Sequence, residues 1–399
     1  MADLMEMESH DNLTLDMLEI DVNYTDNRDL LTLNNDKAFV LLPVVVYVIV
    51  LMVCGLVGNS FVCYIYRCRF RRNTSNFFIV FLAIMDLFCC CVGMSFELSD
   101  LLLPYLFNAP AACKIFRFIE TWASGASGLV LVCVALDRYY KLCKPTERFS
   151  LKRAKIFCCV AIFIALVMAV PSLIVFGKRT VETEVPGING TECSTDDEML
   201  DSPLRIVFYV TMSATFLVSL ICLITLYSLI GFNLWQRKHK KMGEKLKPKG
   251  DYPRTHRFVN SDSSSFSSLS DETKKTQGYV QSHVGIQKTD TMRQAKGYKP
   301  NQGMGHISLK TTRLTCIFFV LSVSFVVSFL PWILANVLKV TKAAFNPFSS
   351  DAMEVLYNFL VRSHFINSSV NPIIYSILNS QFRKECKVVF KRMFKTCKR

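Results

Sequence analysis

The chain has 399 residues, of which 51% are hydrophobic and 20% charged, and its formal net charge is +14. This composition excludes an ordinary soluble protein or enzyme, because the apolar residues fall in blocks of about 20 or more, the length at which a helix crosses a bilayer. The basic residues form short clusters between these blocks and at the C-terminus. Their distribution favours anionic lipid rather than nucleic acid as the partner.

Residues 1–36 precede the first apolar block and are acidic, with ten acids and the single base Arg28. They lack the basic start and apolar core of a cleavable signal peptide, so we expect the first apolar block to act as the targeting signal. Asn12, Asn23 and Asn189 each begin an Asn-x-Thr pattern, which predicts glycosylation wherever the segment is extracellular.

Seven apolar blocks predict seven membrane-spanning helices in an all-α membrane protein. They run roughly Phe39–Tyr66, Asn76–Leu103, Lys114–Tyr140, Ile156–Phe176, Leu204–Trp235, Leu314–Val340 and Leu356–Leu378. Seven spans place every basic cluster (67–72, 141–155, 237–249, 310–313 and 383–399) on one side. The positive-inside rule makes that side cytoplasmic, with the N-terminus extracellular and the C-terminus cytoplasmic, in the plasma membrane.

The chain divides into a tail at 1–38, a seven-span domain at 39–378 and a cytoplasmic segment at 379–399. Within the domain, residues 236–310 are rich in Ser, Lys and Gly and include the run Ser261–Ser268, a composition typical of disorder. Its serines are either kinase substrates or part of a passive linker. Residues 380–394 mix apolar and basic side chains, which predicts a short amphipathic helix on the membrane surface. Cys386 and Cys397 beside it are either palmitoylated or unmodified.

Of the sixteen cysteines, only Cys113 and Cys193 fall in predicted extracellular segments. Two thiols in an oxidising compartment most simply form a disulfide, although they can remain reduced. The bond would tie the third span to loop 177–203, which is long enough to cover the mouth of a helix bundle.

Polar residues inside the spans are costly and usually face the bundle interior. Asp86 lies in mid-span and needs a partner, a proton or a cation. Ser127, Asn367 and Asn371 offer oxygen ligands suited to a small hard cation such as sodium, the one cofactor the sequence indicates. Pro331 and Pro372 predict local kinks in the sixth and seventh spans, either purely structural or marking a moving element.

Asp137-Arg138-Tyr139 ends the third span. A carboxylate beside the guanidinium can hold Arg138 in one orientation until another partner competes for it. The alternative is an arginine that only reaches towards the membrane interface.

In this order, one motif per span, the chain resembles a rhodopsin-like (class A) G-protein-coupled receptor. The motifs are Gly-x-x-Gly-Asn at 55–59, Leu-Ala-x-x-Asp at 82–86, Cys113, Asp-Arg-Tyr at 137–139, Phe216 and Tyr227, Phe-x-x-x-Phe-x-Pro at 325–331, Asn-Pro-x-x-Tyr at 371–375, and Phe382-Arg383. The resemblance covers residues from about 55 to 394, apart from the third cytoplasmic loop.

The resemblance implies a receptor and not an enzyme, and no Gly-x-x-x-x-Gly-Lys loop is present. It implies a cytoplasmic switch made of Asp137, Arg138, Tyr139, Tyr227, Asn371, Pro372 and Tyr375, and a sodium pocket made of Asp86, Ser127, Asn367 and Asn371. A heterotrimeric G protein would be the partner, with receptor kinases and arrestin as further partners. Three departures from the family pattern stand out. Phe329 replaces the usual Trp, and Ser219 replaces the usual Pro. The inner end of the sixth span offers Thr311 and no acid that could pair with Arg138. The last predicts a lightly latched switch with high basal activity.

Glu120, Phe329, Trp332 and Asn336 are the predicted ligand contacts, with Trp122 and Phe208 nearby. Glu120 either contacts the ligand or pairs internally with Arg117, Arg362 or His364. The acidic extracellular segments favour a basic ligand, and we expect a neuropeptide or peptide hormone. The alternatives are a small amine, a non-signalling decoy receptor, and a transporter or channel, for which no continuous polar path or repeated half is evident.

Overall fold

A computed structural model describes residues 29–144, 147, 149–246, 309–340 and 350–396. Asn12, Asn23, the serine run 261–268 and Cys397 lie outside these residues. The chain divides into one unit of residues Met1–Gln236 with Ile307–Arg399 and a second of residues Arg237–His306. The description below concerns the first unit, apart from the continuous helix that ends at Leu246.

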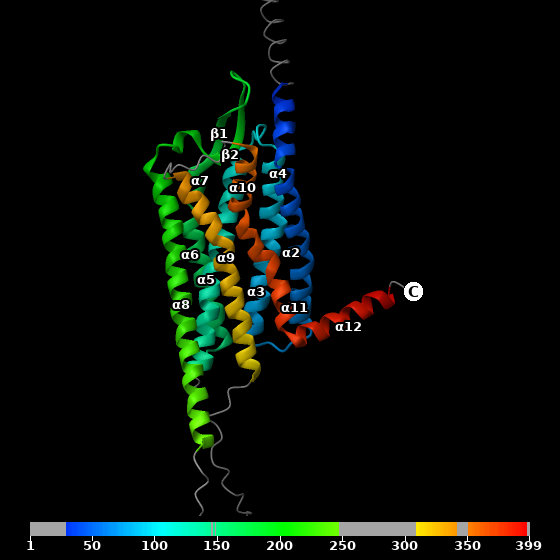
Figure 1. Cartoon of the computed structure of the whole chain (residues 1–399), viewed down its shortest axis with the longest axis vertical. Helices are drawn as coiled ribbons and strands as arrows, with labels where there is room; N and C mark the ends of the chain where they lie inside the picture. The colour runs from blue at the N-terminus through cyan, green and yellow to red at the C-terminus, as the bar shows by residue number, and fades with distance from the viewer. Residues whose placement is uncertain (1–28, 145–146, 148, 247–308, 341–349, 397–399) are drawn as a thin grey trace, which may run out of the picture. The chain divides into compact units, whose positions relative to one another are not determined.

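The first unit is a bundle of long helices that run side by side (Figure 1). Six stretches among the described residues are long and apolar enough to cross a membrane: Leu42–Cys68, Thr74–Leu102, Pro110–Cys143, Leu151–Val175, Pro203–His239 and Thr311–Leu338. The seventh predicted span is present as two shorter helices, α10 (Asp351–Val361) and α11 (Ile366–Leu378). The seven-span architecture predicted from the sequence is confirmed, with its last member broken.

The second membrane span is not a regular α-helix. It consists of α3 (Thr74–Phe88), a π-helical turn (Cys89–Gly93) and α4 (Met94–Leu102). A π-helical turn accommodates an extra residue and shifts the direction of the side chains that follow it. The turn therefore sets which face of α4 points into the bundle, and Glu97 on that helix is only 1% exposed.

The seventh segment is broken between α10 and α11 by Arg362 and a 3-10 turn (Ser363–Phe365). The Ser363 hydroxyl donates a hydrogen bond to the Ser328 carbonyl of α9 (Leu309–Val340) at 2.8 Å, which holds the break against the neighbouring helix. Arg362, Ser363 and His364 are all buried here. Irregular backbone at membrane depth is tolerated where protein surrounds it.

α5 (Pro110–Cys143) is the long helix that joins the two ends of the bundle. Its middle is lined by small residues that let neighbouring helices approach closely. A Cβ added at Gly128 would lie 2.8 Å from Cζ of Phe325 on α9, so a larger residue here would require the Phe325 ring to move. α6 (Leu151–Ala169) with the short α7 (Ser172–Val175), and α8 (Pro203–Leu246), complete the bundle.

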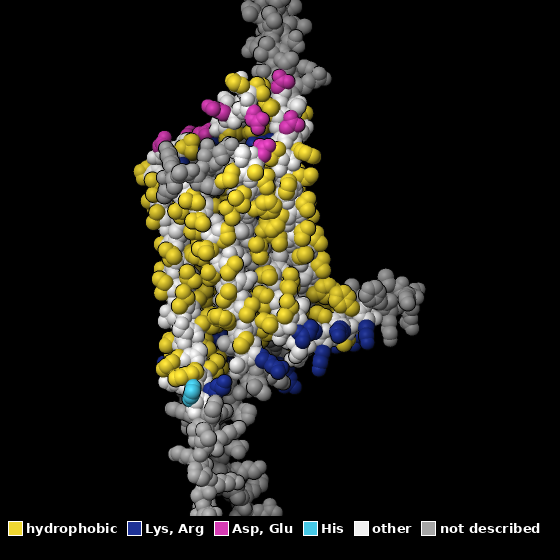
Figure 2. All heavy atoms as spheres, viewed as in Figure 1, with side chains coloured by type: hydrophobic (Ala, Val, Ile, Leu, Met, Phe, Trp, Pro, Cys, Tyr) yellow, Lys and Arg dark blue, Asp and Glu magenta, His cyan; other side chains and the backbone are white. Residues whose placement is uncertain are grey.

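Apolar side chains cover the outside of the helices, as expected of a lipid-facing surface. Phe163, Ile221 and Val327 are 65%, 62% and 64% exposed. On the face shown in Figure 2, hydrophobic side chains form a broad band, acidic side chains gather at the end that carries the hairpin, and basic side chains gather at the end that carries α12. The charges thus separate along the bundle as the sequence predicted.

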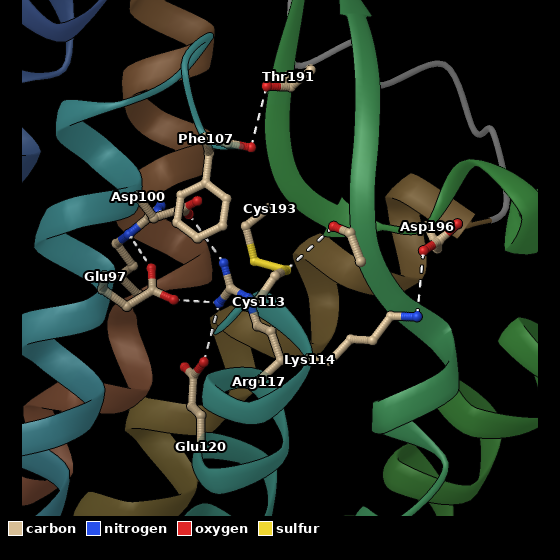
Figure 3. The surroundings of a disulfide bond; sticks show 12 residues. Glu97, Asp100, Phe107, Cys113, Lys114, Arg117, Glu120, Thr191, Cys193 and Asp196 are labelled. Atoms are coloured by element: carbon tan, nitrogen blue, oxygen red, sulfur yellow. Dashed lines mark hydrogen bonds and ion pairs between the residues drawn. A yellow bond between two sulfur atoms is a disulfide. The ribbon is translucent and has the colours of Figure 1, made fainter. Parts of the chain in front are cut away.

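An antiparallel hairpin of β1 (Phe176–Glu182) and β2 (Asn189–Thr195) covers one end of the bundle. Gly187 in its turn has φ of +94°, a backbone conformation that favours glycine. The Thr191 amide donates to the Tyr105 carbonyl at 2.8 Å, and the Phe107 amide donates to the Thr191 carbonyl at 2.9 Å. Cys113 and Cys193 form the predicted disulfide, so the hairpin is fixed to both α5 and the segment after α4 (Figure 3).

Both ends of the described chain dock onto the bundle. Residues 29–40 are helical, earlier than the span predicted from Phe39, and the buried Asn34 side chain donates to the Leu102 carbonyl at 3.2 Å. At the other end, α12 (Ser380–Thr396) is the predicted amphipathic helix. It is anchored by the buried Phe382 ring and by an Arg69–Glu385 ion pair of 2.9 Å.

Candidate functional site

A cavity of about 250 Å³ opens beneath the hairpin, between α4, α5, α8, α9 and α10. Glu192 and Cys193 of β2 and Phe176 of β1 form part of its wall, so the disulfide that fixes the hairpin also shapes the cavity. One part of the cavity wall is charged, and an adjoining part is aromatic. This combination suits a ligand that carries both a polar group and an apolar group.

The charged side consists of six buried or largely buried residues on three helical segments, here called the charged cluster. Its members are Glu97, Asp100, Arg117, Glu120, Arg362 and His364. Arg117 stands at its centre and reaches a carboxylate on each side (Figure 3). Its guanidinium pairs with Glu97, lies 3.0 Å from Asp100 Oδ2, and lies 3.1 Å from Glu120 Oε2.

Arg362, at the break in the seventh segment, closes the charged cluster from the other side. Its Nε lies 2.7 Å from Glu97 Oε2 and its Nη2 lies 3.3 Å from Asp100 Oδ2. Its Nη1 donates to Asn358 Oδ1 at 2.5 Å. Glu97 is thus shared by two arginines from different helices, and Asp100 is shared by the same two.

The aromatic side is a stack of rings that begins beside the charged cluster and descends into the bundle. The His364 ring lies 5.6 Å from Phe329 and 6.1 Å from Trp332, measured between centroids. Phe329 lies 4.4 Å from Phe325, and Phe216 of α8 packs on both of these phenylalanines. His364 is therefore in direct contact with aromatic rings of α9.

The predicted ligand residues Glu120, Phe329, Trp332 and Asn336 all line this cavity. Glu120 also pairs internally, with Arg117 and with His364, whereas Arg362 pairs with Glu97 and Asp100. Trp122 points elsewhere, because its indole Nε1 donates to the Ile162 carbonyl at 3.3 Å and its ring packs on Phe88. Sequence reasoning missed Glu97 and Asp100, although two carboxylates within an apolar block are themselves a signal for a functional site.

The predicted sodium residues lie deeper in the bundle, and all four are buried. The Asn371 side-chain amide donates to Asp86 Oδ2 at 2.8 Å, which brings these two residues together. Oδ1 of Asn371 is buried without a hydrogen-bond partner, so an oxygen acceptor beside the Asp86 carboxylate remains available. No hydrogen bond joins Ser127 or Asn367 to Asp86 in the part of the chain described. The carboxylate and the amide oxygen fit a small hard cation.

At the opposite end of α5, Arg138 is 1% exposed and Asp137 is fully buried. Arg138 pairs with Asp137, donates to the Ser75 hydroxyl at 2.5 Å, and lies with its guanidinium 5.0 Å from the centre of the Phe318 ring of α9. Lys141 shares the Asp137 carboxylate at 3.1 Å. Arg138 is therefore held by a carboxylate, a hydroxyl and an aromatic face, and α9 contributes a ring rather than an acid.

The other predicted switch residues lie around this end. Tyr227 of α8 shares a hydrogen bond of 3.2 Å with Ser322 of α9 rather than with Arg138. Tyr375 and Pro372 of α11 are buried, and the Tyr375 hydroxyl has no hydrogen-bond partner. Tyr139 packs edge-on against Tyr140. At Ser219, α8 continues as an uninterrupted α-helix, whereas the irregular turn lies in the second span.

A family model described as "7 transmembrane receptor (rhodopsin family)" matches residues 58–375. The chain belongs to the rhodopsin family of seven-transmembrane receptors. This membership makes it a multi-pass membrane protein and a receptor. The matched residues include the Asp137–Tyr139 motif on α5 and the Asn371–Tyr375 motif on α11.

Similar curated proteins include the neuropeptide S receptors of Macaca mulatta, Rattus norvegicus and Homo sapiens. The rhesus and rat proteins are each 34% identical to this receptor, over 136 and 137 residues, and the human protein is 32% identical over 136 residues. Each match covers 33% of this chain and 36% of the relative. The chain thus matches little more than a third of the length of these relatives.

Proposed function

We propose that this receptor binds an extracellular peptide in the cavity beneath the hairpin and activates a heterotrimeric G protein at the Arg138 end. The observation that carries the proposal is that one continuous helix, α5, presents Glu120 to the cavity and Arg138 to the other end of the bundle. A shift of this helix between two positions at one end can therefore be transmitted to its other end. The similarity to neuropeptide S receptors supports a peptide over a small amine.

The test uses full-length receptor in lipid nanodiscs, a peptide library, and guanine-nucleotide exchange on each class of purified G protein. We expect at least one peptide to raise exchange, and we expect Arg138→Ala to abolish the rise while leaving peptide binding intact. Arg69→Ala removes an arginine from the exposed pair with Glu385 and serves as the matched control, with exchange unchanged. Ion flux without any peptide-driven exchange would replace the proposal with the channel alternative.

Sodium at Asp86 is part of the proposal, with the ion favouring the inactive state. The buried carboxylate and the unpartnered Asn371 oxygen support it. Sodium, compared with N-methylglucamine at equal ionic strength, should raise the Tm of the receptor and lower its basal exchange. Asp86→Asn should remove both effects, and a sodium response that survives in this variant would exclude Asp86 as a ligand.

The orientation follows the charge separation, with the acidic hairpin end extracellular and the basic α12 end cytoplasmic. α12 would then lie on the inner leaflet, and kinases and arrestin would act on the same side. Burial raises the pKa of the Cys386 thiol, which disfavours its reaction with an acyl donor. Cys397 is the lipidation candidate predicted from the sequence, and the Cys397→Ser variant should lose incorporated palmitate.

A further inference from the structure

The hydrogen bonds of His364 fix where one proton must lie in the charged cluster. Nδ1 of His364 lies 3.0 Å from the Val361 carbonyl oxygen, and Nε2 lies 3.0 Å from Glu120 Oε1. A backbone carbonyl accepts hydrogen bonds only, and an ionised carboxylate also accepts only. Both ring nitrogens therefore carry hydrogen, or Glu120 carries it and donates to Nε2. In either arrangement one proton is held between Glu120 and His364.

That proton makes the charged cluster electrically neutral. Glu97, Asp100 and Glu120 supply three negative charges, and Arg117 and Arg362 supply two positive charges. The proton shared by Glu120 and His364 is the third positive charge. When it leaves, the charged cluster carries one uncompensated negative charge in a largely buried setting, which is costly unless another cation replaces it.

The other carboxylates that line the cavity are each paired with a basic side chain, so Glu120 and His364 are the groups left to exchange the proton for a cation. Glu192 of β2 lies 3.8 Å from Arg179, and Glu354 of α10 pairs with Lys37. The part of α9 that lines the cavity, from Phe325 to Asn336, contains no titratable side chain. Asp100 and Glu97 each contact both arginines.

We infer that the cavity takes a cationic group of the ligand, an amine or a guanidinium, in exchange for the proton held between Glu120 and His364. The inference rests on the proposed function, and it adds the charge of the ligand and a dependence of binding on pH. The incoming cation pairs with Glu120 while the proton passes to solvent, so the charged cluster stays neutral in both states. His364, released from Glu120, is then free to shift against the Phe329 and Trp332 rings.

The probe is N-acetyl-arginine amide, which carries one positive charge on its guanidinium, and its neutral isostere N-acetyl-citrulline amide is the control ligand. Binding to full-length receptor in nanodiscs is measured by ligand-observed NMR between pH 5.5 and 8.5. Where the proton is bound, the affinity for the arginine probe should fall by about tenfold per unit decrease in pH. The citrulline compound should show no such dependence.

Two variants separate the roles of the pair. Glu120→Gln should weaken the arginine probe by at least about tenfold, because it removes the charge that the probe neutralises. His364→Gln leaves Glu120 as the only member of the pair that can hold the proton, so the pH below which the affinity for the arginine probe falls should shift from its wild-type position. Glu385→Gln and His239→Gln, both outside the charged cluster, are matched controls that should retain the wild-type pH dependence.

A second readout follows the proton directly. In receptor with ¹⁵N-labelled histidine, the wild-type spectrum at pH 5.5 should contain a buried imidazole held in a hydrogen-bonded, protonated pair. The signal should disappear in His364→Gln and change when the arginine probe is added. Equal binding of the arginine and citrulline compounds, or a pH profile unchanged in His364→Gln, would overturn the inference. Peptide-driven nucleotide exchange in that same preparation would leave the proposed function standing.

Discussion

The charged cluster makes a quantitative prediction for Glu97→Gln. Glu97 is 1% exposed and contacts both Arg117 and Arg362, so its removal leaves two buried guanidinium groups short of one negative charge. Breaking a buried ion pair by removing one partner costs about 3–5 kcal/mol. Both arginines keep Asp100 in this variant, and Arg117 also keeps Glu120, so we expect the lower end, about 3 kcal/mol.

Thermal unfolding of the ligand-free receptor in nanodiscs measures this loss. At roughly 2 °C per kcal/mol, the Tm should fall by about 6 °C. Glu385→Gln is the matched control, because it removes a carboxylate from a partly exposed ion pair whose contribution is about 1 kcal/mol or less. If Glu97→Gln lowers the Tm no more than Glu385→Gln does, the two arginines do not depend on Glu97 and the reasoning about the charged cluster is refuted.

Three further predictions concern the packing and the two ends of the bundle. Gly58→Ala should destabilise the receptor by roughly 1–3 kcal/mol, because the added Cβ would lie 2.6 Å from Pro372. Gly231→Ala is the control: its added Cβ meets nothing within 4 Å, so the variant should not lower the Tm. Asp137→Asn should raise basal nucleotide exchange several-fold, because Arg138 and Lys141 lose their shared carboxylate; exchange equal to wild type would show that Ser75 and Phe318 alone hold Arg138. Deletion of Cys91 should replace the π-helical turn by an α-helical one; because the turn accommodates one extra residue, α4 should keep the same face towards the bundle and binding of the arginine probe should be retained. Loss of binding would show that the π-helical turn itself is needed.

Much of the fold could be predicted because span length and charge asymmetry are properties of the sequence itself. The apolar blocks located all seven spans to within a few residues at most ends, and the basic clusters marked one end of the bundle. The disulfide followed from the topology, because only Cys113 and Cys193 lay in segments placed outside. The breaks within spans were not predicted. The π-helical turn at Cys89–Gly93 interrupts a stretch that is as apolar as a regular span. The seventh segment carries Arg362 and His364 at its break, but polar residues alone do not reveal where a helix is interrupted.

The candidate site was partly predictable for a related reason. Single residues such as Glu120, Asp86 and Arg138 stand out in an apolar block, and the motifs assign them positions. Their partners depend on how helices are rotated against each other, which a span of uniform hydrophobicity does not reveal. The sequence left Glu120 as either a ligand contact or an internal partner of Arg117, Arg362 or His364, and in the structure it pairs with Arg117 and His364. The lightly latched switch was predicted from the missing acid, and Ser75 of α3 and Phe318 of α9 contact Arg138 in addition to Asp137.

The irregular parts of the bundle converge on the charged cluster. The π-helical turn precedes Glu97 and Asp100, and the break in the seventh segment carries Arg362 and His364. Within a membrane, backbone that leaves the α-helix is costly and persists where it lines a cavity or is surrounded by protein. Here the ion pairs between the carboxylates of α4 and the arginines of α5 and the broken segment offset the cost of the irregular backbone. A helix that is already interrupted at His364 also needs less rearrangement to move that residue than a continuous helix would. The break thus carries the two residues, Arg362 and His364, that help to neutralise the carboxylates of the cavity. A cationic ligand that displaces the proton from the Glu120–His364 pair would free the His364 ring to move against the aromatic side chains of α9.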